Sequence, residues 1–298
     1  MQDQDMMTKI ASGKGFIAAL DQSGGSTPKA LKGYGIEEDA WSNDDEMFGL
    51  IHQMRSRIIS SPAFTGDKVI GAILFEKTMD GQVNGKATPQ ALIDKGVVPF
   101  IKIDKGLEDE ANGVQLMKPM PGLDTLLARA KSLGVFGTKE RSVINLANRE
   151  GIAAVVAQQF DVARQVLAAG LVPIIEPEVN IKSAERAEAD AILLEEITKA
   201  LDALPGDDKV MLKLSIPAEP NLFKPLVDHP RVLRVVALSG GFSRSEACAE
   251  LAKNEGMIAS FSRALLSDLR HQMSDADFDA ALGEAIDEIN QASTVKAA

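Results

Sequence analysis

Cysteine, histidine and aromatic residues are all scarce in this chain of 298 residues. The one cysteine, Cys248, excludes a disulfide framework or a thiolate metal cluster within one chain, and we expect a reducing, cytoplasmic location. The three histidines, His52, His229 and His271, fall in two predicted helices and a loop rather than at strand ends. A histidine-ligated zinc site is therefore not expected.

Long hydrophobic runs and an excess of positive charge are also missing. No apolar stretch approaches the ~20 residues that span a bilayer, so we expect no membrane partner. The formal net charge of −11 argues against nucleic acid, although local basic residues can still hold a small phosphorylated ligand. We expect one domain over residues 1–298, with a short N-terminal helix and a loose C-terminal tail at residues 293–298.

Short β-type runs alternate with longer amphipathic segments along the chain. The expected strands are Phe16–Asp21, Val69–Phe75, Val97–Ile103, Val135–Arg141, Leu171–Glu176, Lys209–Leu214, Leu233–Leu238 and Met257–Phe261. The expected helices are Glu46–Ser60, Leu123–Ser132, Glu150–Ala169, Ser183–Ala203, Ser243–Asn254 and Ala264–Met273, and Gly81–Lys95 is expected to be a loop. This order predicts an α/β fold, a single (β/α)8 TIM barrel, with an open doubly wound sheet as the alternative.

A lysine stands inside one apolar run, in Val210-Met211-Leu212-Lys213-Leu214. Lysine is almost never fully buried without a partner or a chemical role. Other apolar runs end on a charge, at Asp21, Lys102 and Glu176. Because the carboxyl ends of barrel strands meet at one mouth, where barrel enzymes bind ligands, we expect these charges to gather there.

Most of the expected strands end on polar residues. Those expected at the mouth are Asp21, Ser23, Ser26, Lys102, Asp104, Lys139, Arg141, Glu176, Glu178, Lys213, Ser239, Gly240, Gly241, Ser262 and Arg263. One such charge is more often a structural ion pair than a catalyst, and Gly and Ser are ordinary turn residues. Their concentration at one end of the strands favours a ligand site, because a purely structural role would place charges at either end.

Lys213 has the surroundings that suit a Schiff base. An amine attacks a carbonyl only when deprotonated, and apolar walls and nearby cations favour that form. Met211 and Leu214 supply apolar neighbours, and Lys139 and Arg141 are candidates for the cations. The resulting iminium would draw electrons from an adjacent C–C bond.

Further mouth residues suit the other parts of this chemistry. Glu176 and Asp21 are carboxylates that can move protons. Backbone amides of the two glycine-rich loops, with Lys102 and Arg263, can hold phosphates at the two ends of a substrate. The sequence therefore favours a substrate that carries phosphate groups.

Six motifs occur in a fixed order along the chain. They are Ala18-Ala19-Leu20-Asp21-Gln22-Ser23-Gly24-Gly25-Ser26, Ile101-Lys102-Ile103-Asp104-Lys105-Gly106, Val172-Pro173-Ile174-Ile175-Glu176-Pro177-Glu178, Leu212-Lys213, Leu238-Ser239-Gly240-Gly241 and Phe261-Ser262-Arg263-Ala264-Leu265. In this order the chain resembles the class I fructose-1,6-bisphosphate aldolases, the metal-independent Schiff-base type. The resemblance runs from Gly13 to about Leu265.

The resemblance implies a role for each mouth residue. Lys213 matches the Schiff-base lysine, Glu176 the carboxylate that transfers protons in imine formation and hydrolysis, and Asp21 the acid–base residue near the cleaved bond. Lys139 matches a lysine that polarises the substrate, with Glu178 supporting it. The implied substrate contacts are Arg141, then Ser23, Ser26 and Lys102 at one phosphate, and Ser239, Gly240, Gly241, Ser262 and Arg263 at the other.

The implied activity is that of a lyase of glycolysis and gluconeogenesis. It would reversibly cleave fructose 1,6-bisphosphate into dihydroxyacetone phosphate and glyceraldehyde 3-phosphate, with a covalent imine on Lys213 and neither metal nor cofactor. Its partner would be a sugar-phosphate substrate, and a homo-oligomer stays open. Relatives with a C-terminal catalytic tyrosine are not the model, because Tyr34 is the only tyrosine.

Three alternatives remain at this point. An all-carboxylate Mg²⁺ site at Asp104, Glu176 and Glu178 would make the chemistry metal-dependent. A Schiff-base aldolase or transaldolase for another sugar phosphate would use the same lysine. A non-catalytic barrel that binds sugar phosphates would keep the phosphate loops without turnover.

Overall fold

Eight parallel strands form the centre of the structure, a computed structural model that describes residues 1 and 3–297. They are β1 (Phe16–Leu20), β2 (Val69–Leu74), β5 (Val98–Lys102), β7 (Gly137–Ile144), β8 (Val172–Val179), β9 (Val210–Ser215), β10 (Val232–Leu238) and β11 (Ile258–Ala259), adjacent in this order. The Ala19 amide donates to the Phe261 carbonyl at 3.1 Å, which joins the last strand to the first. The sheet is a nearly closed barrel, so the predicted TIM barrel is confirmed and the open sheet is wrong.

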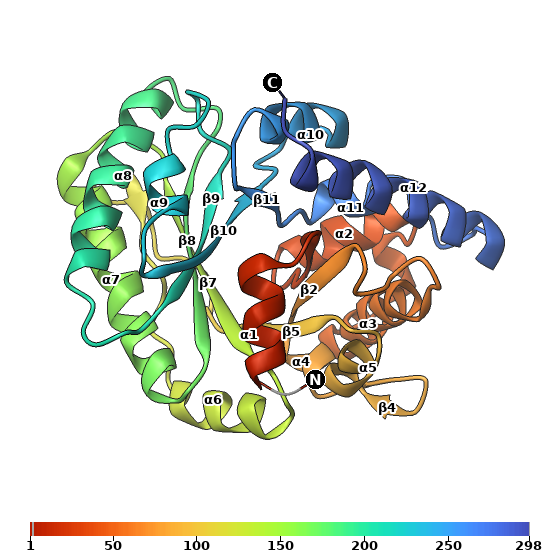
Figure 1. Cartoon of the computed structure of the whole chain (residues 1–298). Helices are drawn as coiled ribbons and strands as arrows, with labels where there is room; N and C mark the ends of the chain where they lie inside the picture. Colours follow the sequence, from red (N-terminus) through yellow and green to blue (C-terminus); the bar gives the residue numbers. More distant parts are fainter. Residues whose placement is uncertain (2, 298) are drawn as a thin grey trace.

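Helices surround the barrel (Figure 1). They are α1 (Asp3–Ser12), α2 (Ser26–Tyr34), α3 (Asp44–Ser60), α4 (Glu76–Met79), α5 (Thr88–Asp94), α6 (Leu123–Ser132), α7 (Arg149–Ala168), α8 (Arg186–Asp202), α9 (Lys224–Val227), α10 (Arg244–Ala252), α11 (Arg263–Leu266) and α12 (Asp275–Thr294), with a 3₁₀ turn at Glu38–Ala40. Within the described residues, no helix is long and apolar enough to cross a membrane.

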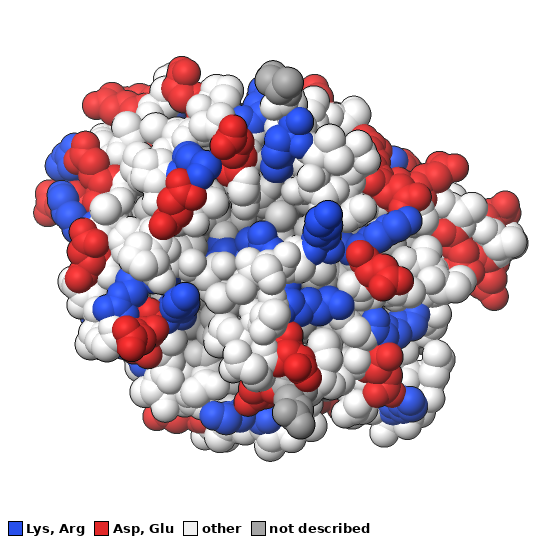
Figure 2. Space-filling view, in the orientation of Figure 1, with Lys and Arg blue, Asp and Glu red and all other residues white. Residues whose placement is uncertain are grey.

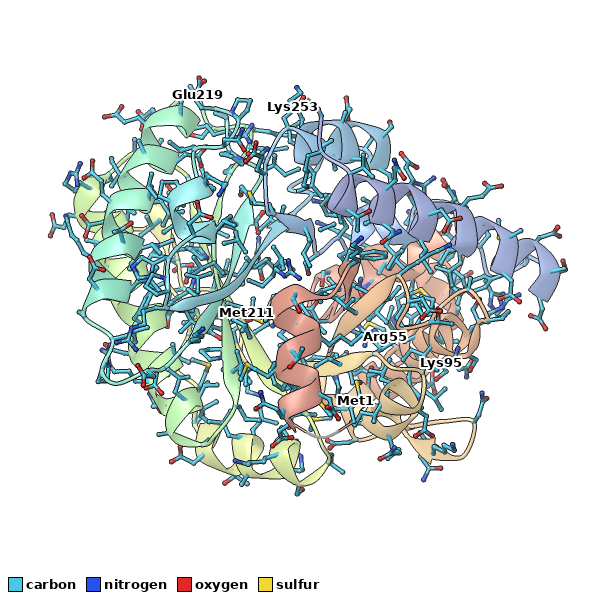
Figure 3. The ribbon with its side chains drawn as sticks, viewed as in Figure 1. Met1, Arg55, Lys95, Met211, Glu219 and Lys253 are labelled. Carbon is cyan, nitrogen blue, oxygen red and sulfur yellow. The ribbon has the colours of Figure 1, made fainter. Side chains whose placement is uncertain are left out.

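Helix α1 covers the amino-terminal end of the barrel, which faces the viewer in Figure 1. Its buried side chains Met6 and Ile10 pack in one cluster with barrel-interior residues such as Phe100 and Met211, and Figure 3 shows Met211 beside this helix. Arg234 donates to the Ile10 carbonyl at 2.9 Å and so binds the carboxyl end of the helix. Basic and acidic side chains are interspersed over this face (Figure 2). Because α1 closes the amino-terminal end of the barrel, a ligand site is expected at the carboxyl ends of the strands.

Capping residues set the ends of the predicted helices. At the start of α10, the Ser243 hydroxyl accepts from the Glu246 amide while the Glu246 carboxylate accepts from the Ser243 amide, which is a capping box. Asn148 caps α7 by accepting from the Gly151 amide at 2.9 Å. Past the end of α7, Gly170 has φ 74°, the left-handed conformation that ends many helices.

The segment predicted as a loop, Gly81–Lys95, contains regular structure, so that prediction is wrong. It forms the hairpin β3 (Gln82–Val83) and β4 (Lys86–Ala87), followed by α5. The turn residues Asn84 and Gly85 have φ 52° and 77°, which an Asn-Gly pair adopts more readily than others. This Asn-Gly signal was present in the sequence, but the strands beside it are only two residues long.

Two strands run further than predicted because their polar ends stay in the sheet. β7 continues to Ile144, where the short strand β6 (Val114–Gln115) pairs with it in the antiparallel sense. β8 continues to Val179, and its register pairs Glu178 with Val143. These extra residues lengthen the wall on one side of the mouth.

The C-terminal region differs most from the prediction. The helix expected over Ala264–Met273 ends at Leu266, and α12 was not predicted. The tail expected to be loose is hydrogen-bonded up to residue 297. Ser293 accepts from the Ala259 amide at 3.0 Å, and the Lys296 ammonium donates to three backbone carbonyls. Ala298 lies outside the described residues.

Candidate active site

A pocket of about 830 Å³ opens at the carboxyl ends of the barrel strands. The predicted site residues that line it are Asp21, Ser23, Ser26, Lys102, Asp104, Lys139, Arg141, Glu176, Glu178, Lys213, Ser239, Gly240, Ser262 and Arg263. Gly241 directly follows this wall, and a Cβ at Gly241 would lie 3.7 Å from an Arg263 guanidinium nitrogen. The fold thus brings together residues that are far apart in the sequence.

Four buried charged residues form a chain of ion pairs at the base of the pocket. The Lys139 ammonium lies 2.8 Å from Asp21 Oδ2 and 2.7 Å from Glu176 Oε2. The other oxygen of Glu176 lies 3.1 Å from Lys213 Nζ. All four residues are at most 7% exposed. The sequence suggested cations beside Lys213, whereas its direct ionic contact is a carboxylate that it shares with Lys139.

The protonation states of these ion-paired side chains follow from their contacts. Burial raises the pKa of Asp21, but the charges of Lys139 and then Lys213 outweigh burial and hold that pKa well below its usual value. Burial lowers the pKa of Lys139, but Asp21 and Glu176 raise it well above the usual value. At neutral pH, Asp21 is therefore a carboxylate that can accept a proton, and Lys139 is a fixed cation.

Two further ion pairs line the pocket above this chain. Arg141 Nε contacts Glu178 Oε2 at 2.5 Å, and Lys102 Nζ contacts Asp104 Oδ1 at 2.6 Å. Glu178 thus pairs with Arg141, whereas the resemblance implied support of Lys139. Within residues 1 and 3–297, no three His, Cys, Asp or Glu residues are grouped as metal ligands, which includes the carboxylates of the Mg²⁺ alternative.

The two predicted phosphate loops have backbones shaped by tight turns. In the loop after β1, Ser26 Oγ donates to the Ser23 carbonyl at 2.7 Å and accepts from the Ser23 amide at 2.9 Å. In the loop after β10, Gly240 has φ 60°, and a Cβ there would lie 2.8 Å from a methyl group of Ile181. A side chain at this position would be strained and would also clash.

Gln22 and Arg55 support the site and were missed in the sequence. Gln22 Nε2 donates to Ser262 Oγ at 2.5 Å, which links the loops after β1 and β11. Arg55, fully buried on α3 (Figure 3), donates to the Gln22 carbonyl at 2.5 Å and to Thr78 Oγ1 at 2.8 Å. Burial lowers the pKa of Arg55 to about 10. Its one sequence signal was an arginine on the apolar face of a helix.

Glu140 lies on β7 between Lys139 and Arg141 but does not line the pocket. Alternate strand residues point to opposite sides, so Glu140 faces the surrounding helices together with Thr138 and Ser142. It is fully buried, and neither carboxylate oxygen has a hydrogen-bond partner among the described residues. Burial, with a smaller contribution from the Asp104 carboxylate, raises the pKa of Glu140 well above its usual value.

We expect Glu140→Gln to stabilise the protein at neutral and higher pH. Below the usual pKa of 4.5, Glu140 is protonated in both states and the substitution changes little. Above it, unfolding releases the proton, so wild-type stability falls by about 1.4 kcal/mol per pH unit until the folded pKa is reached. Urea unfolding from pH 4 to 8 measures the gain. The exposed Glu284→Gln is the control, and a gain independent of pH would contradict the account.

The barrel and its buried chain of lysines and carboxylates define an α/β-barrel enzyme with the residue types that imine chemistry needs. A family model described as fructose-bisphosphate aldolase class-I matches residues 4–225. The chain therefore belongs to the class I fructose-bisphosphate aldolase family. It is an enzyme, a lyase, and its family acts on sugar phosphates.

Comparison with solved structures agrees with this fold. The chain is similar to fructose-bisphosphate aldolase from Plasmodium falciparum, solved with TRAP and a small-molecule inhibitor, with a TM-score of 0.79 and 20% sequence identity. The alignment covers 99% of this chain and 96% of that one. A putative orotidine-monophosphate-decarboxylase from Toxoplasma gondii has 12% identity over 98% and 97% of the two chains, with a TM-score of 0.42.

Proposed function

We propose that this enzyme cleaves fructose 1,6-bisphosphate through a Schiff base on Lys213. The observation that carries the proposal is the position of Lys213. It is a lysine of 4% exposure, on a barrel strand, lining the pocket and sharing Glu176 with a second lysine. Family membership supports the reaction class, and the contacts support the assignment of roles to individual residues.

Glu176 is the proton carrier for imine formation in this proposal. The neutral amine of Lys213 adds to the C2 carbonyl of the open-chain sugar. Glu176, 3.1 Å from that nitrogen, takes one proton as the ammonium form gives the free amine and a second proton as the C–N bond forms. It delivers both to the C2 oxygen, which leaves as water when the C2–O bond breaks. The product is an iminium ion, and the same carboxylate serves the reverse steps in hydrolysis.

Asp21 is the base for carbon–carbon cleavage in this proposal. Its pKa is held low, so it is ionised and can take the proton of the C4 hydroxyl as the C3–C4 bond breaks. The bonding electrons move into the iminium and give an enamine, and glyceraldehyde 3-phosphate leaves. Lys139, in contact with both carboxylates, keeps the negative charge of the site balanced.

The order of the strands supports an assignment of the two phosphates. The loop at Ser239–Gly241 follows β10, which is the neighbour of the Lys213 strand β9. We assign this loop, with Ser262 and Arg263, to the phosphate nearer the imine. The loop at Ser23–Ser26 follows β1, which is further round the barrel, and takes the distal phosphate with Lys102.

The reaction is proposed to need no metal and to take place in the cytoplasm. Because the iminium ion on Lys213 accepts the electrons of the broken bond, no metal is needed for this role. We therefore expect full cleavage of fructose 1,6-bisphosphate after dialysis against EDTA. A coupled assay for glyceraldehyde 3-phosphate checks this. Loss of activity that Zn²⁺ or Mg²⁺ restores would contradict the proposal, and a wild type that binds the bisphosphate without turnover would favour a sugar-phosphate sensor.

A further inference from the structure

The connection between β8 and α8 contacts two other segments at the mouth of the barrel. It spans residues 180–185, and α8 begins at Arg186. Ile181 and Arg186 both lie against the phosphate loop after β10, and Arg186 also binds the segment after β9. These contacts join the strand that carries Lys213 to the loop assigned to the nearer phosphate.

Arg186 is hydrogen-bonded to the end of the strand that carries Lys213. Its Nη2 donates to the carbonyl of Ile216, three residues beyond Lys213. Ile216 is buried, and Ser215 Oγ donates to the Val179 carbonyl at 2.6 Å, which joins the ends of β9 and β8. The guanidinium is therefore attached to a backbone segment that the sheet already holds in place.

The same guanidinium packs against the phosphate loop after β10. Its carbon atom Cζ lies 5.8 Å from the centre of the Phe242 ring, within the range of a cation–π contact. The Phe242 amide donates to the Ser239 carbonyl at 2.9 Å, which closes the loop into a turn. A Cβ at Gly240 would lie 2.8 Å from Ile181, so the loop has little room on that side. Arg186 thus connects the end of β9 to this turn.

Asp190, one helical turn further along α8, holds the segment after β9 as well. Its Oδ2 accepts from the Ala218 amide at 2.9 Å and lies 4.0 Å from Arg186 Nε. Asp190 is fully buried, and burial raises its pKa to about 6. At neutral pH it is therefore mostly ionised, and its charge favours the amide and the guanidinium beside it. Among the described residues, neither Asp190 nor Arg186 lines the catalytic pocket, so neither contacts the substrate directly.

We propose that Arg186 and Asp190 are positioning residues that hold the phosphate loop after β10 at a fixed distance from Lys213. The inference rests on the proposed function, in which this loop binds the phosphate nearer the imine. Arg186 reaches the loop through Phe242 and the strand through Ile216. The nearer phosphate is carried on the carbon next to the reacting carbonyl, so a loop that shifts relative to the lysine cannot serve both groups.

The test uses two ketones that differ only in a phosphate group. Dihydroxyacetone phosphate carries the nearer phosphate and dihydroxyacetone carries none, and borohydride traps either one on Lys213. In Arg186→Gln, we expect the concentration of dihydroxyacetone phosphate that gives half-maximal labelling to rise about tenfold. For dihydroxyacetone, we expect a change of less than about twofold, because Lys213 keeps its strand and its contact with Glu176. For fructose 1,6-bisphosphate, the loss should appear in KM rather than in kcat.

Conservative variants separate positioning from folding. Arg186→Lys keeps a cation that can donate to the Ile216 carbonyl, so it should restore part of the affinity for dihydroxyacetone phosphate. Asp190→Asn keeps an oxygen for the Ala218 amide and should stay within about twofold of the wild type, whereas Asp190→Ala should lose about fivefold. Circular dichroism checks that each variant is folded. Arg186→Gln, which changes a partly exposed side chain, decides the matter if Asp190→Ala does not fold.

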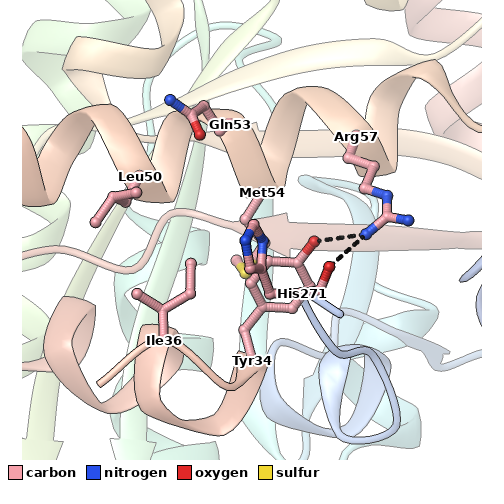
Figure 4. Close-up of a pocket in the computed structure, with 7 residues that line it drawn as sticks. All are labelled: Tyr34, Ile36, Leu50, Gln53, Met54, Arg57 and His271. Atoms are coloured by element: carbon pink, nitrogen blue, oxygen red, sulfur yellow. Dashed lines mark hydrogen bonds between the residues drawn. The ribbon is translucent and has the colours of Figure 1, made fainter. Parts of the chain in front are cut away.

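Arg57 of α3 is a matched control, because it makes the same kinds of contact at a different pocket. Its Nη1 donates to Tyr34 Oη and to the His271 carbonyl, each at 3.2 Å, beside a cavity of about 300 Å³ (Figure 4). Its Cζ lies 4.2 Å from the centre of the Phe278 ring. Arg57→Gln should lower the melting temperature but leave the labelling of Lys213 by both ketones unchanged.

Two results would overturn the proposal. Equal losses for the two ketones in Arg186→Gln would show a general disturbance of the mouth. Unchanged labelling by both would show that the phosphate loop does not depend on Arg186. Failure of the proposed function would look different, because the wild type itself would then carry no label on Lys213 with either ketone.

Discussion

Lys213→Met is expected to abolish cleavage of fructose 1,6-bisphosphate, lowering kcat by more than about 10⁴-fold. Methionine has no nucleophilic nitrogen, so neither the imine nor the iminium electron sink can form. The fold should survive, because Glu176 keeps its contact with Lys139 at 2.7 Å and the new side chain is apolar and of similar length. Steady-state assays with circular dichroism check both expectations.

The control for this change lies four residues away on the same segment. Lys209 is exposed and precedes β9, so Lys209→Met removes the same charge without touching the pocket. We expect wild-type kinetics from it. Ligand binding by Lys213→Met, measured by calorimetry with the bisphosphate, should persist, because the phosphate loops are intact. A Lys213→Met protein that still turned over would contradict the assigned mechanism.

Lys139→Met is expected to impair both catalysis and stability. The change leaves Asp21 and Glu176 buried without the cation that lies within 2.8 Å of both, which costs about 3–5 kcal/mol of unfolding free energy at neutral pH. Without this charge, the proton transfers assigned to the two carboxylates are disturbed, and we expect kcat to fall by about 10²–10⁴-fold. Lys139→Arg, which keeps the charge, should lose less stability.

The stability loss should depend on pH in a definite direction. In the wild type, the lowered pKa of Asp21 contributes stability that is present above its usual pKa of 3.8 and is lost as the pH falls below it. Lys139→Met lacks most of this contribution. The difference in unfolding free energy between the two proteins should therefore shrink as the pH falls through 3.8, between pH 5 and pH 2. Urea titrations at both pH values test this, and a difference that grows on acidification would contradict the account.

The barrel could be predicted because apolar runs and charges follow one rule. In a parallel barrel, both faces of each strand are buried until the strand reaches the mouth, so the first charge after an apolar run marks the mouth. Asp21, Lys102 and Glu176 followed this rule and lie together in the pocket. The positions of the strands, and through them the location of the site, could therefore be predicted from the order of apolar runs and charged residues along the sequence.

Contacts between distant elements could not be predicted in the same way. Arg55 reaches Gln22 across 33 residues of sequence, and no local pattern marks such a pair. The same holds for Glu176, which proved to lie between two lysines. Asp268, two residues past the end of α11, binds Arg244, a contact that only the folded chain makes. Which side chains pair with one another inside a buried network is therefore determined by the tertiary structure and not by local sequence.

Covalent trapping on Lys213 tests the central claim most directly. The wild-type enzyme is incubated with dihydroxyacetone phosphate, reduced with borohydride, digested and analysed by mass spectrometry. The account predicts one adduct, on the peptide that contains Lys213, and none in Lys213→Met. An adduct on Lys139, on another lysine, or on no lysine at all would contradict it.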